Sequence, residues 1–185
     1  MTTDEGNVVF TASIPGGIKT RSSYDDGKLA VNLTYAVYDE DGNNIATLNG
    51  TETFDENLKT TVKLNLITGK TYTVVFWGSS PDASYYSFDA STGKMTVTPT
   101  GVANDKSRDA FFAYEKFKVT GAINKTVELK RPFAQINIGT SDLADFQNAG
   151  GTISTSGIKV SSPTVLDLRD GSVDETTETE YVYTP

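Results

Sequence analysis

Apolar and polar residues alternate in short stretches that recur about every ten residues along this chain. The clearest stretch, residues 29–38, puts five apolar side chains on one face: Leu29, Val31, Leu33, Tyr35 and Val37. A period of two residues is typical of a β-strand with one buried face. The same pattern predicts further strands at residues 8–14, 45–48, 60–66, 71–77, 85–88, 94–98, 116–120, 153–160 and 164–168.

Two stretches depart from simple alternation. Residues 71–77 are apolar on both faces, which predicts a central strand that is covered on both sides. In residues 126–140, one alternating half ends at Pro132 and a second half, with Ile136 and Ile138, begins after it. Because proline removes a backbone donor, we predict a strand that bends there and crosses from one sheet to the other.

Helical signals are few. Thr140 or Ser141 can cap a helix and Gly150 can end it, which predicts one short helix near residues 141–149. For residues 104–114 we expect a short helical turn, although strand spacing fits them as well. The helices that a parallel sheet needs between its strands are missing, so the pattern predicts an all-β fold, a Greek-key β-sandwich.

Composition narrows the chemistry. The chain has 185 residues, a formal net charge of -8, and neither Cys nor His. An acidic chain is a poor partner for nucleic acid, because phosphate binding needs Lys and Arg. The lack of Cys and His removes thiolate and imidazole ligands and the commonest general base. We therefore expect a non-enzymatic protein without catalytic residues, cofactor or metal, and no apolar run approaches the ~20 residues of a membrane span.

Two motifs could bind a ligand, and each has a simpler explanation. Residues 39–43 resemble the start of a calcium loop, but Gly50 stands where the bidentate glutamate belongs, and a hairpin turn explains them. Trp77, Tyr85 and Tyr86 could form an aromatic platform for a sugar ring. Core packing is the simpler explanation for Trp77, whereas Tyr85 and Tyr86 adjoin a turn and are the candidate exposed aromatics for a ligand.

Residues 129–137, with the sequence LKRPFAQIN, resemble a signature of the amino-terminal domain of the fimbrillin family, surface proteins of Bacteroidales. Three further segments are similar to the family's pattern and occur in its order: residues 36–42, 69–77 and 108–112. Members are pilus subunits or related outer-membrane lipoproteins with a transthyretin-like β-sandwich. The resemblance implies such a domain at residues 1–169, followed by an acidic linker or the start of a second domain at residues 170–185.

The resemblance also implies an assembly mechanism. Polymerising members lose their first strand to an Arg-specific protease, and the open groove accepts a strand from the next subunit. Here the displaceable strand would be residues 8–14, and Arg21 in the following polar loop would be the processing site. The inward face of that strand is Val8, Phe10, Ala12 and Ile14. An ordinary first strand followed by a surface arginine explains the same residues.

Two functions stay open at this point. The first is a fimbrial (pilus) subunit or pilus-associated component whose partners are other pilus subunits. The second is an outer-membrane surface lipoprotein domain that binds glycan or host protein through exposed loops such as residues 78–93. Both imply export to the cell surface, with an export signal and a lipidated cysteine upstream of this chain. Typical subunits add a second domain and a donor strand, so we expect either a domain of a longer protein or a short member that does not polymerise.

Overall fold

The structure is a computed structural model and describes residues 5–15, 27–81, 83–134, 136, 138–139 and 141–183. Its strands form three sheets. The first sheet has the order β4 (Lys59–Ile67), β1 (Glu5–Ser13), β9 (Ile123–Glu128). The middle sheet has the order β3 (Gly50–Thr53), β2 (Asn32–Tyr38), β5 (Thr71–Ser79), β8 (Ala110–Lys118). The outer sheet has the order β11 (Val173–Tyr183), β10 (Ser156–Asp167), β7 (Lys94–Val97), β6 (Tyr86–Asp89).

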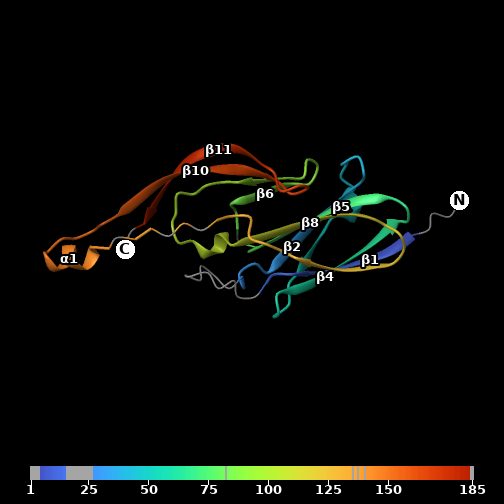
Figure 1. The fold of residues 1–185 in the computed structure, drawn as a ribbon, viewed down its shortest axis with the longest axis horizontal. Coiled ribbons are helices and arrows are strands. Elements are labelled where there is room, and N and C mark those ends of the chain that lie inside the picture. The colour runs from blue at the N-terminus through green and yellow to red at the C-terminus, as the bar shows by residue number, and fades with distance from the viewer. Residues whose placement is uncertain are drawn as a thin grey trace.

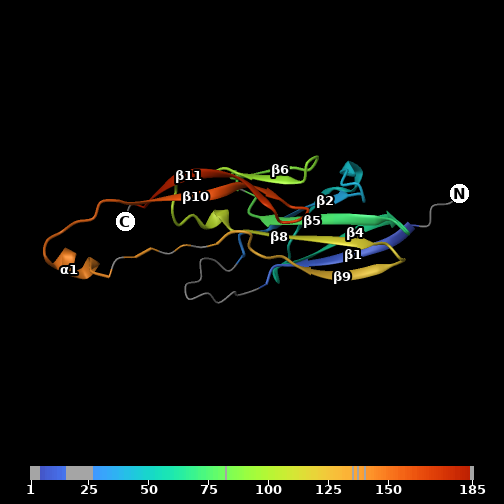
Figure 2. The ribbon, with the colours of Figure 1, turned by 45° about the horizontal axis from the view of Figure 1, so that its top comes forward.

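The three sheets stack as layers, with the middle sheet between the other two (Figure 2). A first core fills the space between the first and middle sheets, and it includes Phe10, Leu64 and Phe76. A second core lies on the opposite face of the middle sheet, and it includes Trp77, Met95 and Leu166. The central strand β5 is buried along seven consecutive residues, so the prediction of a strand covered on both sides is confirmed.

The predictions of an all-β fold and of one short helix are confirmed. The helix, α1, spans Leu143–Asn148, inside the predicted range of residues 141–149. Two 3-10 turns complete the described elements, η1 (Ala46–Leu48) and η2 (Lys106–Arg108). The Greek-key, transthyretin-like topology stays a prediction, and the outer sheet is a layer that sequence reasoning did not anticipate.

The strand predicted at residues 29–38 is correct only in part. It begins at Asn32, and Leu29, which was assigned to the buried face, is 44% exposed. Leu33 and Val37 are buried as expected, but Ala36 and Tyr38 on the opposite face are buried too. The physical reason is the outer sheet, which covers the face that alternation alone assigns to solvent.

The returning strand predicted at residues 45–48 was wrong, because that segment forms η1, and the next strand along the chain that pairs with β2 is β3. An asparagine side chain explains the difference. Asn49 Oδ1 accepts a hydrogen bond from the Val37 backbone N–H at 3.1 Å, so a side chain takes the position of a strand partner. Side chains that bond the backbone in this way compete with regular pairing.

The bent strand predicted at residues 126–140 is correct only before Pro132. β9 pairs with β1 in the first sheet, and Lys130 then pairs with Phe112 of β8 in the middle sheet. The chain therefore does cross between sheets, but before the predicted bend at Pro132. The described residues between Pro132 and Ser141 form no strand, which contradicts the second half of the prediction. Ile136 and Ile138 are 65% and 66% exposed, so no second layer buries their shared face.

The two strands predicted at residues 153–160 and 164–168 are one strand, β10, which runs through Pro163. Proline is tolerated there because β7 pairs only with residues 165–167, so the rest of β10 has β11 as its one neighbour. The acidic stretch forms β11, and the β10–β11 hairpin extends towards α1, far from β1 (Figure 1). The division into domains at residues 169 and 170 stays a prediction.

Candidate functional site

The strand that the resemblance marks as displaceable, β1, occupies the centre of the first sheet. It pairs antiparallel with β4 along Glu5–Ser13 and parallel with β9 along Val8–Ser13. Further backbone hydrogen bonds hold its end, from Ile14 to Leu58 at 3.0 Å and from Leu129 to Ser13 at 2.8 Å. A strand with partners on both edges is part of the sheet, not an appendage to it.

The inward face of β1 is confirmed as buried. Val8, Phe10 and Ala12 are 0% exposed, and Ile14 just beyond the strand is 3% exposed. The Phe10 ring makes edge-to-face contacts with Phe76 at 5.3 Å and Phe117 at 5.4 Å between centroids. Burial of a Val, Phe or Ile side chain stabilises the fold by about 1.5–3 kcal/mol, so losing β1 would strongly destabilise the first core.

Loss of β1 would also change the sheet itself. The order β4-β1-β9 makes β1 the sheet partner of both neighbours, so its removal leaves two unpaired edges facing one groove. Two strand spacings of about 4.8 Å separate β4 from β9, which leaves room for one replacement strand. Arg21 lies outside the described residues, and its role as a processing site stays a prediction.

Two of the segments that carry the resemblance meet at the entrance of β8. The Arg131 guanidinium donates two hydrogen bonds of 2.6 Å to the two carboxylate oxygens of Asp109, whose side chain is 3% exposed. The same guanidinium lies 4.8 Å from the centroid of the Phe111 ring. This bidentate pair joins the chain after β9 to the start of β8 and is a structural clamp, which sequence reasoning did not identify.

Tyr85 and Tyr86 are half-buried, and their hydroxyl groups are tied to η2. The Tyr85 hydroxyl donates to the Asp105 carboxylate, and the Tyr86 hydroxyl donates to the Arg108 carbonyl oxygen. Hydrogen bonds from the Ser107 hydroxyl and then from Tyr85 lower the pKa of Asp105. The Tyr86 ring stacks on Phe133 at 5.9 Å. Their role as ligand-binding aromatics stays a prediction.

An apolar groove opens between the β10–β11 hairpin and the segment that follows Pro132. Its volume is about 840 Å³. Apolar side chains from both sides and from the loop before η2 line it, among them Val102, Phe133, Ile136, Ile138, Ile158 and Tyr181. The alternation of Ile136 and Ile138 was visible in the sequence, but it marks the wall of a groove and not a buried strand.

Within the described residues, no group of three or more acidic side chains is arranged to hold a metal ion. No helix in the described part of the chain is both long enough and apolar enough to cross a membrane.

Comparison with solved structures finds a similar fold in proteins of Porphyromonas and Bacteroides species. The fimbrial anchor protein Mfa2 of Porphyromonas gingivalis superposes with a TM-score of 0.57 at 13% identity, over 95% of this chain and 66% of that chain. A provisionally named polysaccharide-binding protein of Bacteroides thetaiotaomicron gives a TM-score of 0.57 at 11% identity, over 95% and 64%. A provisionally named adhesin of the same species gives 0.53 at 16% identity, over 100% and 64%.

This chain therefore spans less than two thirds of the length of these structures. At such low identity the similarity shows the fold alone. No curated protein sequence matches the chain. The model of a family of unknown function, DUF6562, matches residues 1–185, and the chain belongs to that family.

Proposed function

We propose that this chain is a non-enzymatic cell-surface protein, a fimbrial subunit or pilus-associated component that assembles by β-strand exchange. The proposal includes a distant relationship to the fimbrillin family, with a transthyretin-like sandwich, and export to the outer membrane or fimbria. The observation that carries it is the position of β1, which is buried on its inward face and paired on both edges. A segment of this kind leaves a groove with backbone donors and acceptors on both sides when it is displaced.

The fold similarity to a fimbrial anchor protein supports the same proposal. So does the apolar groove, because the exposed apolar side chains on its wall, Ile136 and Ile138, offer surface that a partner can bury. Ile136 and Ile138 are about two-thirds exposed, at 65% and 66%, in the chain on its own. We assign this groove to contact with a second copy of the chain in the assembled fimbria.

Limited digestion with an Arg-specific protease tests strand exchange. Arg21 is the only arginine before Arg108 in the sequence, so a cut there releases a fragment that contains β1. Intact mass would identify the cut, and size-exclusion chromatography would show whether β1 stays bound. A synthetic peptide covering residues 5–17 is then added, and we expect it to exchange into the cut protein.

The matched control is Arg21→Lys, which keeps the positive charge but removes the site of an Arg-specific protease. We expect this variant to stay uncut at position 21 and to take up no peptide. A wild-type chain that resists cutting at Arg21, or that unfolds once it is cut, would contradict the proposal.

A second candidate function is a surface lipoprotein domain that binds glycan or host protein through loops 78–93. The observation that favours it is the aromatic cluster beside this loop, where Tyr86 lies 5.1 Å from Trp77 and 5.9 Å from Phe133 between ring centroids. One structure of the same fold carries a provisional polysaccharide-binding name. A glycan array probed with the intact chain tests this candidate, and the absence of any bound glycan would leave it unsupported.

A further inference from the structure

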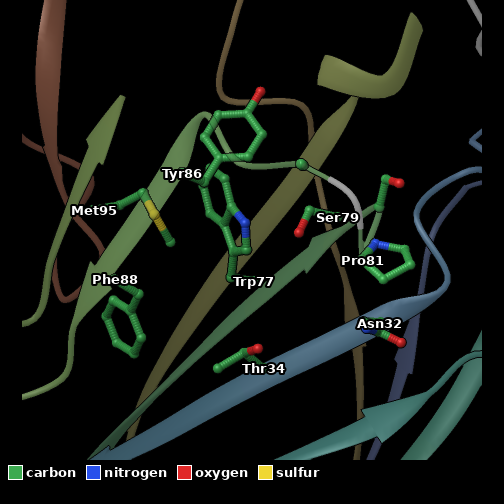
Figure 3. A pocket seen from close by; sticks show the side chains of 10 residues that line it. Asn32, Thr34, Trp77, Ser79, Pro81, Tyr86, Phe88 and Met95 are labelled. Atoms are coloured by element: carbon green, nitrogen blue, oxygen red, sulfur yellow. The ribbon is translucent and has the colours of Figure 1, made fainter. Parts of the chain in front are cut away.

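The second core leaves a pocket of about 200 Å³ at the end where β2 begins (Figure 3). Its floor consists of two residue pairs on neighbouring strands, Asn32 opposite Ser79 and Thr34 opposite Trp77. These residues continue the face of β2 that buries Ala36 and Tyr38 further along. The walls come from β6 and β7 and carry Tyr86, Phe88 and Met95.

The indole N–H of Trp77 is the feature that requires an explanation. The Trp77 side chain is deeply buried, with 3% of the residue exposed. Among the buried side-chain nitrogen and oxygen atoms of the described residues, Trp77 Nε1 alone has no hydrogen-bond partner. Figure 3 shows this nitrogen on the side of the ring that faces Ser79, at the pocket. Since buried polar groups are nearly always hydrogen-bonded, the pocket offers a donor in need of an acceptor.

The other lining groups define the chemistry of that acceptor. None of the described residues that line the pocket carries a charge, so these residues favour a neutral ligand over an ionic one. The Asn32 amide and the Thr34 and Ser79 hydroxyls can both donate and accept hydrogen bonds. Phe88 and Met95 present apolar surface opposite them. A neutral, polyhydroxylated molecule with one apolar face satisfies both sides.

The volume limits the size of the ligand. Pockets for drug-sized molecules occupy about 300–1,000 Å³, and this one is smaller. It is nevertheless several times the ~30 Å³ share of a single water molecule. The space therefore suits one ring with its substituents and not a chain of several rings.

We propose that this pocket binds a single neutral saccharide ring. A ring hydroxyl oxygen accepts the hydrogen bond from Trp77 Nε1–H, the hydroxyls bond Asn32 and Thr34, and the C–H face packs against Phe88. The site deepens the second candidate function and gives it a ligand class. It does not depend on displacement of β1, so its failure and the failure of strand exchange are distinguishable.

The test uses the fact that Trp77 is the only tryptophan, so the ¹⁵N-labelled chain gives one indole N–H cross-peak. The probes are the methyl pyranosides of glucose, galactose and mannose, with sorbitol as a polyol that has no ring. We expect at least one pyranoside to move the indole cross-peak saturably, with a dissociation constant of about a millimolar, as ligands of roughly a dozen non-hydrogen atoms reach. Sorbitol should not move it.

Three variants separate the site from a general solvent effect. Thr34→Val removes one hydroxyl from the floor, keeps Trp77, and should weaken binding about five- to tenfold. Thr61→Val is the matched control on the exposed face of β4 and should bind as the wild type does. Trp77→Phe removes the N–H donor and should weaken saturation transfer from the protein to the pyranoside. An indole cross-peak that no pyranoside moves would overturn the proposal and leave water as the partner of this N–H. Equal shifts with sorbitol, or wild-type affinity in Thr34→Val, would overturn it as well.

Discussion

At the scale of single residues, the Arg131–Asp109 pair fixes the path of the chain between two sheets. Removing one partner of a buried ion pair leaves the other charge without compensation, which costs about 3–5 kcal/mol. The Asp109 side chain is 3% exposed, so it has little access to water. We therefore expect Arg131→Ala to lower the free energy of unfolding by about that amount in urea titrations. Arg131→Lys keeps the charge but not the bidentate geometry, so its free energy of unfolding should lie between those of the wild type and the alanine variant. An alanine variant as stable as the wild type would show that the clamp is dispensable.

Burial of Tyr38 should make the stability of the fold depend on pH. Its ring is 0% exposed, its hydroxyl donates to the Ala90 carbonyl oxygen at 2.8 Å, and burial raises its pKa to about 12. Above pH ~10 an unfolded tyrosine loses its hydroxyl proton, whereas Tyr38 in the folded chain keeps it. The contribution of Tyr38 to the free energy of unfolding is therefore complete below pH ~10 and is lost as pH rises towards 12.

Tyr38→Phe should therefore lose less stability than the wild type between about pH 9 and pH 11, although its stability at neutral pH should fall by about 1 kcal/mol with the lost hydrogen bond. Urea titrations at both pH values measure the difference, and Tyr114→Phe, at an exposed position on β8, is the control. Parallel losses in the wild type and the Tyr38 variant would contradict the burial argument.

At the scale of elements, β1 contributes side chains to the first core and also holds β9 in the first sheet. Phe10→Ala removes a fully buried ring between Phe76 and Phe117 and should cost about 3–5 kcal/mol. Because β9 has β1 as its only partner in the first sheet, amide hydrogens of Ile123–Glu128 should also exchange faster in this variant. Val9→Ala changes the other face of the same strand and should have a much smaller effect. Unchanged exchange in β9 would show that β9 is held by contacts outside the sheet.

The elements also show what the sequence can and cannot predict. Strand β4 was predictable because Val62, Leu64 and Leu66 alternate with polar residues and face one core. Sequence reasoning predicted strands at the positions of β6, β7 and β10 but did not place them in a third layer. It read the remaining strand, β11, as a linker, because β11 is almost entirely exposed and acidic. Without that sheet, the burial of Tyr38 had no visible cause.

The candidate sites follow the same division between local and long-range information. The buried position of Trp77 was predictable from its apolar strand, and it is confirmed. The missing partner of its N–H was not, because that depends on how Asn32 and Phe88 from two other strands surround it. The Arg131–Asp109 pair joins residues that are 22 positions apart, and no spacing rule connects them.

At the scale of the whole molecule, the three sheets differ in how much of their surface is packed against a core. The first and middle sheets share an extensive core, whereas the outer parts of β10 and β11 face the open groove with largely exposed side chains. A hairpin that projects in this way presents one of its faces to whatever occupies the groove (Figure 1). Under the proposed function this occupant is a second copy of the chain, and its binding would bury apolar surface that the isolated chain leaves in water.

The double variant Ile136→Lys/Ile138→Lys tests this assignment. Both side chains are about two-thirds exposed, at 65% and 66%, so the substitutions should change the free energy of unfolding by no more than about 0.5 kcal/mol. Two lysines in an apolar groove would have to be desolvated on association, so sedimentation velocity should show weaker self-association than in the wild type. Ile67→Lys, at the exposed end of β4, is the control and should associate normally. If the double variant and the wild type associate equally, the groove is not the contact between copies, and strand exchange would have to account for assembly alone.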